Sequence, residues 1–320
     1  MSKPLINTVA EFLGFEISVV TEMAGKAQRT YRHYKIPKKK RGLRTIYHPS
    51  KETKSIQYAL MQILAETLTP HDCAFAYKPG LSSPLRKNAE THARFAYSLR
   101  IDFKDFFPSI KPADLFAAIT DAGNPKKIDL LPEDREFLSQ AFFVKVADGS
   151  LGLPIGAPSS PMLSNGVMRS LDIAIDAFAK NREFVYTRYA DDLVFSTAQK
   201  GASKAFLDGL RPLLSKCEHP RLTINEEKTL FMSRNCRRVV TGMTIDPNGT
   251  ISIGRARKRF IRSLLNEFKH GGLIMKQPHI LQGNLAFILD VEPRFYNRLC
   301  LKYGADLVSR ALRQRGDRAD

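Results

Sequence analysis

Hydrophobic and polar residues follow two different periods along this 320-residue chain, which indicates a mixture of helices and strands. Helices are predicted over residues 5–27, 55–68, 114–122, 132–147, 161–180 and 203–217, and through most of the chain after residue 255. Strands are predicted over 34–47 (a basic hairpin), 96–103, 184–187, 193–197, 231–232, 238–245 and 251–253. This order predicts an α+β fold in which antiparallel strands and helices are followed by a helical C-terminal part.

Two of the predicted strands enclose the sequence Tyr189-Ala190-Asp191-Asp192. A short polar break between two apolar runs is typical of a β-hairpin, so Asp191 and Asp192 are predicted at its tip. Adjacent carboxylates between such apolar strands repel each other unless a cation offsets them. An ordinary solvated Asp turn is the alternative interpretation.

A third carboxylate, Asp102, is predicted near the C-terminal end of the buried strand 96–103. An aspartate there is costly unless it is solvated, hydrogen-bonded or bound to a metal. Together with Asp191 and Asp192 it supplies hard oxygen ligands of the kind that Mg²⁺ prefers, and a pair of such ions is suited to nucleotidyl transfer. Asp105, close by, is expected either to contribute or simply to be solvated.

These segments resemble a reverse transcriptase, and more narrowly the bacterial retron type. The Asp102 segment is similar to the family's first palm motif, Tyr189-Ala190-Asp191-Asp192 to its third, and the Gly- and Pro-rich segment 152–161 to its second. Asn88-Ala89-Glu90-Thr91-His92 and Val240-Thr241-Gly242 are similar to two elements found in retron enzymes. The resemblance runs in order from about residue 38 to 242, and it implies a right-hand polymerase.

The resemblance also implies a division of the chain. Residues 1–95 would form N-terminal helices and fingers, 96–250 the palm with a fingers-like insertion at about 110–150, and 251–320 a basic helical thumb that binds RNA. Many relatives carry Gln where this chain has Ile155, so the polar nucleotide contact of that position does not transfer.

The family's site residues transfer only at matching positions. The three aspartates and the backbone carbonyl of Phe103 would hold two Mg²⁺ ions. Phe107 would exclude ribonucleotides as a sugar gate, with a plain core aromatic as the alternative, and Tyr189 would lie beneath the primer terminus or pack against the sheet. The nucleotide contacts implied are Lys39, Lys40, Arg44, Phe107 and Gly156. The primer or template contacts implied are Tyr189, Asn88, His92, Lys228, Val240, Thr241 and Gly242.

Three of these assignments leave alternatives open. An ordinary surface lysine is an equal interpretation of Lys228. Structural hydrogen bonds are an equal interpretation of Asn88 and His92, and Val240-Thr241-Gly242 is also compatible with a strand that contains a Gly bulge.

The charge of the chain fits a polyanionic partner. With 50 Lys and Arg against 32 Asp and Glu, the formal net charge is +18. Residues 26–54 carry eleven basic residues against one acid, and residues 255–320 carry fourteen against six. Either cluster alone is compatible with a solvated basic face, but together they fit a nucleic-acid channel, with RNA contacts expected at the thumb from Arg255, Arg257, Lys258, Arg259 and Arg262.

Several partners and locations follow as expectations. No apolar run of membrane-spanning length and no signal peptide is apparent, and the four scattered cysteines support neither zinc nor disulfides, so a cytoplasmic protein is expected. The resemblance implies dNTP substrates and a cognate structured non-coding RNA of the msr-msd type. It further implies priming from an internal 2′-hydroxyl, a branched msDNA product, and anti-phage defence with an effector protein. The rival interpretations are a group II intron or diversity-generating reverse transcriptase, and an RNA-binding scaffold that restrains an effector.

Overall fold

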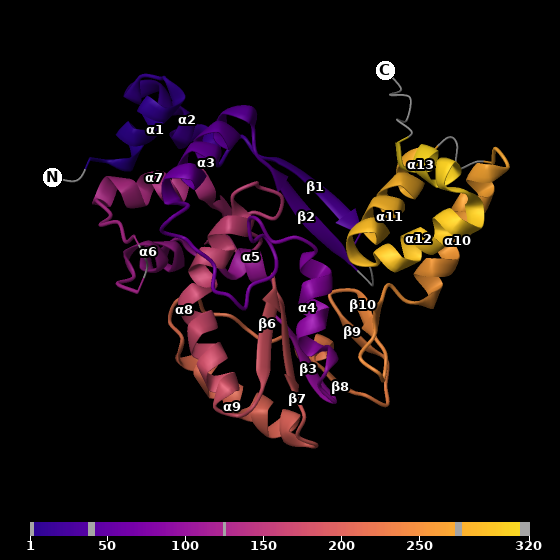
Figure 1. The fold of residues 1–320 in the computed structure, drawn as a ribbon. Coiled ribbons are helices and arrows are strands. Elements are labelled where there is room, and N and C mark those ends of the chain that lie inside the picture. Colours follow the sequence, from indigo (N-terminus) through magenta and orange to yellow (C-terminus); the bar gives the residue numbers. More distant parts are fainter. Residues whose placement is uncertain (1–2, 38–41, 124–125, 273–276, 314–320) are drawn as a thin grey trace. The chain divides into compact units, whose positions relative to one another are not determined.

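The predicted mixture of helices and antiparallel strands is present in the computed structural model, which describes residues 3–37, 42–123, 126–272 and 277–313 (Figure 1). The chain divides into two units. The first comprises Met1–Pro79 and Leu99–Phe231, and the second comprises Gly80–Ser98 and Met232–Asp320.

The larger sheet has four strands, in the order β6-β7-β3-β8, and most of its residues belong to the first unit. Its strands are β6 (Val185–Tyr189), β7 (Asp192–Thr197), β3 (Tyr97–Asp102) and β8 (Leu230–Ser233). β6 and β7 pair antiparallel with Tyr189 opposite Asp192, which confirms the predicted hairpin. Helix α8 (Ser160–Lys180) packs against β6, and its inward Leu171 and Ile175 join Leu99 and Phe195 in one hydrophobic core.

The N-terminal segment is helical, as predicted for residues 5–27, and it forms two helices, α1 (Leu5–Leu13) and α2 (Ile17–Ala27). Helix α1 ends at Gly14, whose φ of 68° is left-handed and whose N–H donates a hydrogen bond back to the last turn of α1. Glycine adopts this conformation without the steric cost of a side chain, which makes it a common helix stop. Glu16 then begins α2 from an extended conformation.

The basic hairpin is confirmed as β1 (Arg32–Pro37) paired antiparallel with β2 (Leu43–His48). Helix α3 (Lys51–Leu64) begins four residues earlier than predicted because Ser50 caps it, accepting a hydrogen bond from the N–H of Thr53. The other helices of this unit are α5 (Phe106–Ser109), α6 (Pro112–Thr120), α7 (Pro132–Phe142), α9 (Ala202–Lys216) and the short 3₁₀ turn η1 (Glu226–Lys228).

The predicted helix 132–147 is wrong beyond Phe142. Residues after it form strand β4 (Val144–Lys145), which pairs antiparallel with β5 (Leu151–Gly152). β-Branched Val144 and Val146 favour extended backbone, and Gly149, with a φ of 80°, lies in the turn between the strands.

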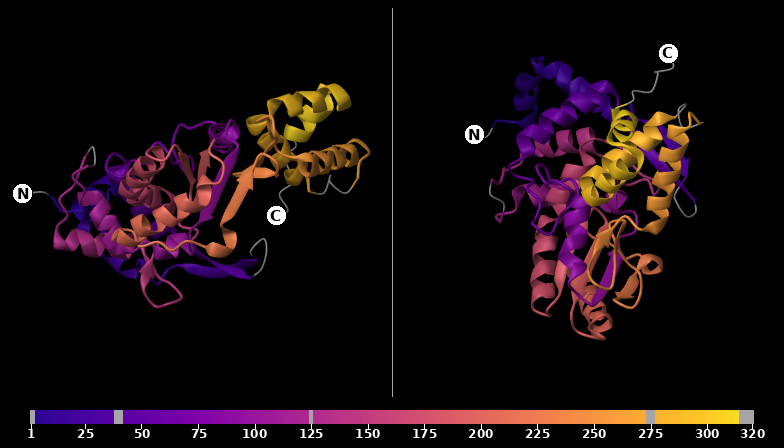
Figure 2. Two further views of the ribbon diagram at one scale, coloured as in Figure 1. Left: turned by 90° about the horizontal axis from the view of Figure 1, so that it is seen from below. Right: turned by 45° about the vertical axis from the view of Figure 1, so that its right-hand side comes forward.

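The second unit joins helix α4 (Pro84–Ala93) to a three-stranded sheet and four helices. The strands are β9 (Arg238–Val240), β10 (Met243–Ile245) and β11 (Ile251–Ser252), in the order β11-β10-β9. The helices are α10 (Arg255–Lys269), α11 (Pro278–Val291), α12 (Pro293–Tyr303) and α13 (Ala305–Arg313), which pack together as one group (Figure 2).

A single strand over 238–245 was predicted, and this is also wrong. Thr241 and Gly242 have positive φ angles of 47° and 79° and form a two-residue turn between β9 and β10. The Val240-Thr241-Gly242 element is therefore a hairpin turn rather than a bulged strand.

Candidate active site

The tip of the β6–β7 hairpin brings its carboxylates to the end of β3. The turn is formed by Ala190, which has a φ of 57°, and Asp191. The N–H of Phe103 donates to the carbonyl oxygen of Asp191 at 3.2 Å. Since β3 ends at Asp102, this bond joins the ends of the two segments that carry the three aspartates.

Two basic side chains pair with two of these carboxylates. Lys228 Nζ donates to Asp102 Oδ1 at 2.6 Å. Arg100, on β3, contacts Asp192 with both ends of its guanidinium, Nε to Oδ1 at 2.8 Å and Nη2 to Oδ2 at 2.6 Å. A two-pronged contact of this kind fixes orientation as well as charge. Lys228 is thus more than an ordinary surface lysine, because it holds Asp102 in place.

Asp191 is the carboxylate without such a direct basic partner in the described part of the chain. Burial and the negative charges of Asp102 and Asp192 raise its pKa to about 6, and Lys228 offsets only a little of this. Burial also raises the pKa of Asp192, where Arg100 opposes the effect. A buried carboxylate held among others favours a bound proton or a bound cation.

The donor set fits divalent cations, which prefer carboxylate oxygens. In the arrangement described for residues 3–37, 42–123, 126–272 and 277–313, no three His, Cys, Asp or Glu side chains converge at metal-ligating distance. At the aspartates, Lys228 pairs with Asp102 and Arg100 pairs with Asp192. The excess negative charge around Asp191 is the physical feature that a cation would relieve.

Sequence reasoning missed Arg188, which links the β6–β7 hairpin to helix α8. Its side chain is fully buried and pairs with the equally buried Asp172 of α8, Nη2 to Oδ2 at 2.7 Å and Nε to both oxygens. Its Nη1 also donates to the carbonyl oxygen of Ala190 in the turn, at 3.2 Å. Tyr186 and Asn165 complete the network through hydrogen bonds to Asp172 and Arg188.

A signal for this network was present in the sequence. A charged residue within a strand of apolar and β-branched neighbours needs a buried partner, and Asp172 occupies a position on the inward face of α8. The distance in sequence between the two residues hid the pairing.

The nucleotide-binding predictions fall on several elements. Phe107 lies in α5, half-buried, with its ring edge-to-face against Phe106 at 5.3 Å. Arg44 is exposed on β2. Gly156 has a φ of 112°, and a Cβ there would lie 2.7 Å from Ile46 Cγ2, so only glycine lets this segment approach β2. Lys39 and Lys40 lie outside the described residues.

The helix and the hairpin that carry the two retron-like elements pack together in the second unit. Thr241 Oγ1 donates to the carbonyl oxygen of Leu85 at 2.8 Å, which joins the β9–β10 turn to α4. On the same helix Asn88 and His92 are fully buried. Burial, with a smaller effect from Arg238, lowers the pKa of His92 to about 3, so the ring is neutral at physiological pH. These positions favour the structural interpretation of Asn88 and His92.

The predicted RNA-binding residues are all on α10. Arg255, Arg257, Arg259 and Arg262 are exposed. Lys258 differs, because its Nζ donates to Glu292 Oε1 at 2.5 Å and Glu292 also accepts from the N–H of Ile253. Lys258 therefore serves an internal ion pair. Arg255 and Arg259 present their charge to solvent. Arg257 and Arg262 also lie over the rings of Phe287 and Phe295, at 4.0 and 5.3 Å from the ring centroids.

Comparison with known proteins decides the family. Residues 36–245 match the family model described as reverse transcriptase (RNA-dependent DNA polymerase). The chain is 37% identical to the Retron Ec83 reverse transcriptase of Escherichia coli over 281 residues, which are 87% of this chain and 88% of that protein. It is 38% identical to the Retron Ec73 reverse transcriptase of the same species over 276 residues, 84% and 85% of the two chains. This chain is a retron-type reverse transcriptase.

The fold of this reverse transcriptase also agrees with solved structures. The structure of apo telomerase from Candida tropicalis superimposes with a TM-score of 0.53 over 93% of this chain and 61% of that chain, at 14% identity. This likeness concerns the fold alone, and it confirms the predicted α+β right-hand polymerase class. The activity of the family, RNA-directed DNA synthesis, follows for this enzyme from its relatives.

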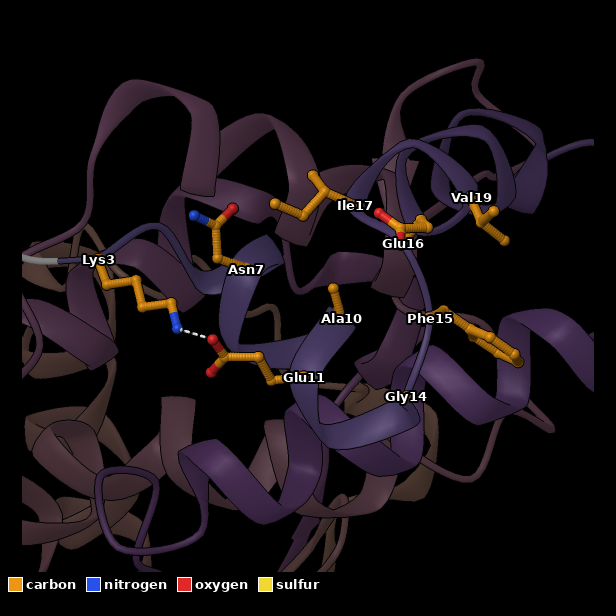
Figure 3. A pocket seen from close by; sticks show the side chains of 9 residues that line it. All are labelled: Lys3, Asn7, Ala10, Glu11, Gly14, Phe15, Glu16, Ile17 and Val19. Carbon is orange, nitrogen blue, oxygen red and sulfur yellow. Dashed lines mark hydrogen bonds and ion pairs between the residues drawn. The ribbon is translucent and has the colours of Figure 1, made fainter.

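Other features of the enzyme lie apart from the predicted site residues. A groove of about 580 Å³ between α1 and α2 is lined by residues such as Asn7, Phe15 and Ile17, and Lys3 pairs with Glu11 beside it (Figure 3). None of its lining residues belongs to the predicted site. Among the described helices, none combines the length and the apolar character that a bilayer span requires.

Proposed function

We propose that this reverse transcriptase copies a structured non-coding RNA into branched msDNA, beginning from an internal 2′-hydroxyl of that RNA. The observation that carries the proposal is its identity of 37–38% to two retron enzymes over more than four fifths of the chain. The Asn88–His92 and Val240–Gly242 elements support it, because both resemble elements of retron enzymes and lie on a helix and a hairpin that pack together.

The three aspartates are proposed as the catalytic centre. Asp102, Asp191, Asp192 and the carbonyl group of Phe103 would hold two Mg²⁺ ions. When bound, such ions activate a primer hydroxyl and stabilise the leaving pyrophosphate. Lys228 and Arg100 orient the carboxylates of Asp102 and Asp192, and Arg188 supports the turn beneath them.

The substrate contacts are proposed from the same frame. Arg44 and the hairpin that carries it would meet the triphosphate, with Gly156 allowing close packing against β2. Phe107 would limit the space beside the sugar and so favour deoxynucleotides, while Tyr189 would support the primer terminus. Residues 1–95, 96–250 and 251–320 would act as fingers, palm and thumb.

The RNA partner is proposed to bind the arginine face of α10. RNA helices are read through shape, phosphates and 2′-hydroxyls, which suits exposed guanidinium groups such as those of Arg255, Arg259 and Arg262. Defence against phage, in the cytoplasm and with an effector protein, completes the proposal.

The test is to express the gene with its flanking DNA and to extract nucleic acid from cells that carry the wild type, Asp191→Ala, Asp192→Ala, or the exposed control Asp208→Ala. The proposal expects a short single-stranded DNA linked to RNA, sensitive to debranching, in the wild type and the control only. Unbranched cDNA would contradict the retron product and indicate another reverse-transcriptase class. RNA that copurifies without any DNA in any strain would indicate a scaffold.

A further inference from the structure

Tyr77 combines two unusual properties. Its backbone is left-handed, with a φ of 56°, although it is neither Gly nor Asn. The residue is also 48% exposed, so its conformation does not bury the ring completely in the core. Left-handed backbone carries a steric cost for a residue with a side chain. Such strain persists only where surrounding contacts impose it, and it is concentrated at functional sites.

The contacts that impose it are on the catalytic hairpin. Residues 73–76 lie alongside β6 as a parallel neighbour, with Ala74 opposite Arg188. The N–H of Arg188 donates to the carbonyl oxygen of Cys73, and the N–H of Phe75 donates to that of Arg188, both at 2.8 Å. Because the two segments run in the same direction, the chain after Ala74 follows β6 towards its tip.

A third bond fixes the residue immediately before Tyr77. Asn165 Nδ2 donates to the carbonyl oxygen of Ala76 at 2.8 Å, and Asn165 Oδ1 accepts from Arg188. The network that supports the Ala190 turn therefore also holds the segment that ends in Tyr77. The side chains of Asn165 and Arg188 therefore hold both the turn and the 73–76 segment in place.

The electrostatic surroundings of Tyr77 agree with this placement. Burial of part of the ring, then Tyr189 and Asp191, raise the pKa of the Tyr77 hydroxyl, while Arg44 lowers it. A neutral aromatic ring thus lies within electrostatic reach of the catalytic tip and of the basic hairpin. The carboxylates at this tip repel the phosphates of a nucleic acid. The face of a base is uncharged, so it can contact an aromatic ring beside these carboxylates.

We propose that the Tyr77 ring binds the RNA–DNA duplex at the primer end by contact with a base, and that the segment 73–76 exists to present it there. The proposal rests on the assignment of Asp102, Asp191 and Asp192 as the catalytic centre. Stacking of a base on an aromatic side chain tolerates any sequence, which suits an enzyme that must move along its template.

The test compares Tyr77→Ala, Tyr77→Phe and the control Tyr58→Ala, which removes a similarly exposed tyrosine from α3. The probe is a fluorescently labelled DNA primer annealed to an RNA template, and its dissociation constant is measured by anisotropy without dNTP. Tyr77→Ala is expected to bind it about tenfold more weakly, and Tyr77→Phe and Tyr58→Ala like the wild type. Single-nucleotide extension with saturating duplex is expected to give an unchanged KM for dNTP.

A further variant, Tyr77→Gly, removes the ring and also relieves the left-handed strain, so it should fold at least as well as the wild type and still bind about tenfold more weakly. Wild-type affinity in Tyr77→Gly or Tyr77→Ala overturns the proposal. Equal loss in Tyr77→Phe, or a raised KM for dNTP with unchanged duplex affinity, also overturns it. Asp191→Asn separates the two proposals, because it should bind the duplex but not extend it. If Asp191→Asn extends normally while Tyr77→Ala loses affinity, the catalytic assignment fails. The binding of the duplex by Tyr77 then stands, but its placement at the primer end is overturned.

Discussion

Replacing Asp191 with Asn should stabilise the metal-free protein while it abolishes DNA synthesis. The carboxylate is buried beside Asp102 and Asp192, and these surroundings raise its pKa from 3.8 to about 6. Asparagine has nearly the same shape but no charge, so it removes the repulsion and keeps the packing of the turn.

The size of the effect follows from that pKa. The folded protein binds the Asp191 proton more tightly than the unfolded chain does, so stability falls as the pH rises from 3.8 through about 6. Above that range the full penalty is about 3 kcal/mol, because each pKa unit corresponds to about 1.4 kcal/mol. At pH 5 the same relation leaves about 1.5 kcal/mol. Asp191→Asn should therefore gain most at pH 7.5 and about half as much at pH 5.

Urea unfolding in EDTA at both pH values measures the gain, with Asp208→Asn on α9 as an exposed control that should change little. Millimolar MgCl₂ should then stabilise the wild type more than Asp191→Asn, because only the wild type keeps the full set of ligands. An Asn variant that is no more stable than the wild type at pH 7.5, or a gain that does not depend on pH, would refute the electrostatic reasoning.

Three further outcomes are expected. Arg188→Met should lower the free energy of unfolding by about 3–5 kcal/mol in urea unfolding, because it leaves Asp172 buried and unpaired. The double variant with Asp172→Leu should recover most of this loss. A loss of under about 1 kcal/mol in the single variant would contradict this reasoning. Phe107→Ala should admit ribonucleotides in single-nucleotide extension, and unchanged discrimination would return Phe107 to a purely structural role. RNA affinity should fall steeply as the salt concentration rises, and a flat response would argue against phosphate contacts. Arg259→Ala should lower the slope of log affinity against log salt concentration by about 1. Lys258→Ala should leave that slope unchanged and lower the stability of the protein instead.

Local pattern was sufficient for the elements that carry the aspartates. The hairpin of β6 and β7 was predictable because residues 184–187 and 193–197 are rich in apolar, aromatic and β-branched side chains, and the break between them is short and polar. The end of β3 at Asp102 was predictable from the turn residues that follow it. In these segments burial and local propensity agree, so the sequence alone determines the structure.

Features that depend on contacts distant in sequence were not predictable in this way. Arg188 of β6 meets Asp172 of α8, which is 16 residues away in sequence, and Lys228 meets Asp102, which is 126 residues away. Tyr77 has no periodic pattern around it, and the residues that precede it are held by hydrogen bonds with Asn165 and Arg188. The breaks at Gly14 and Thr241 were missed because apolar spacing continues across both of them.

The most direct test of the catalytic centre is primer extension by the purified protein on an RNA template with dNTPs and Mg²⁺. Wild type and Asp208→Asn should extend the primer. Asp102→Asn, Asp191→Asn and Asp192→Asn should each fall by at least about a hundredfold, because ion-mediated stabilisation of the transition state is worth several kcal/mol. Extension within about threefold of the wild type by any one of these three variants would contradict the assignment of that aspartate to the reaction.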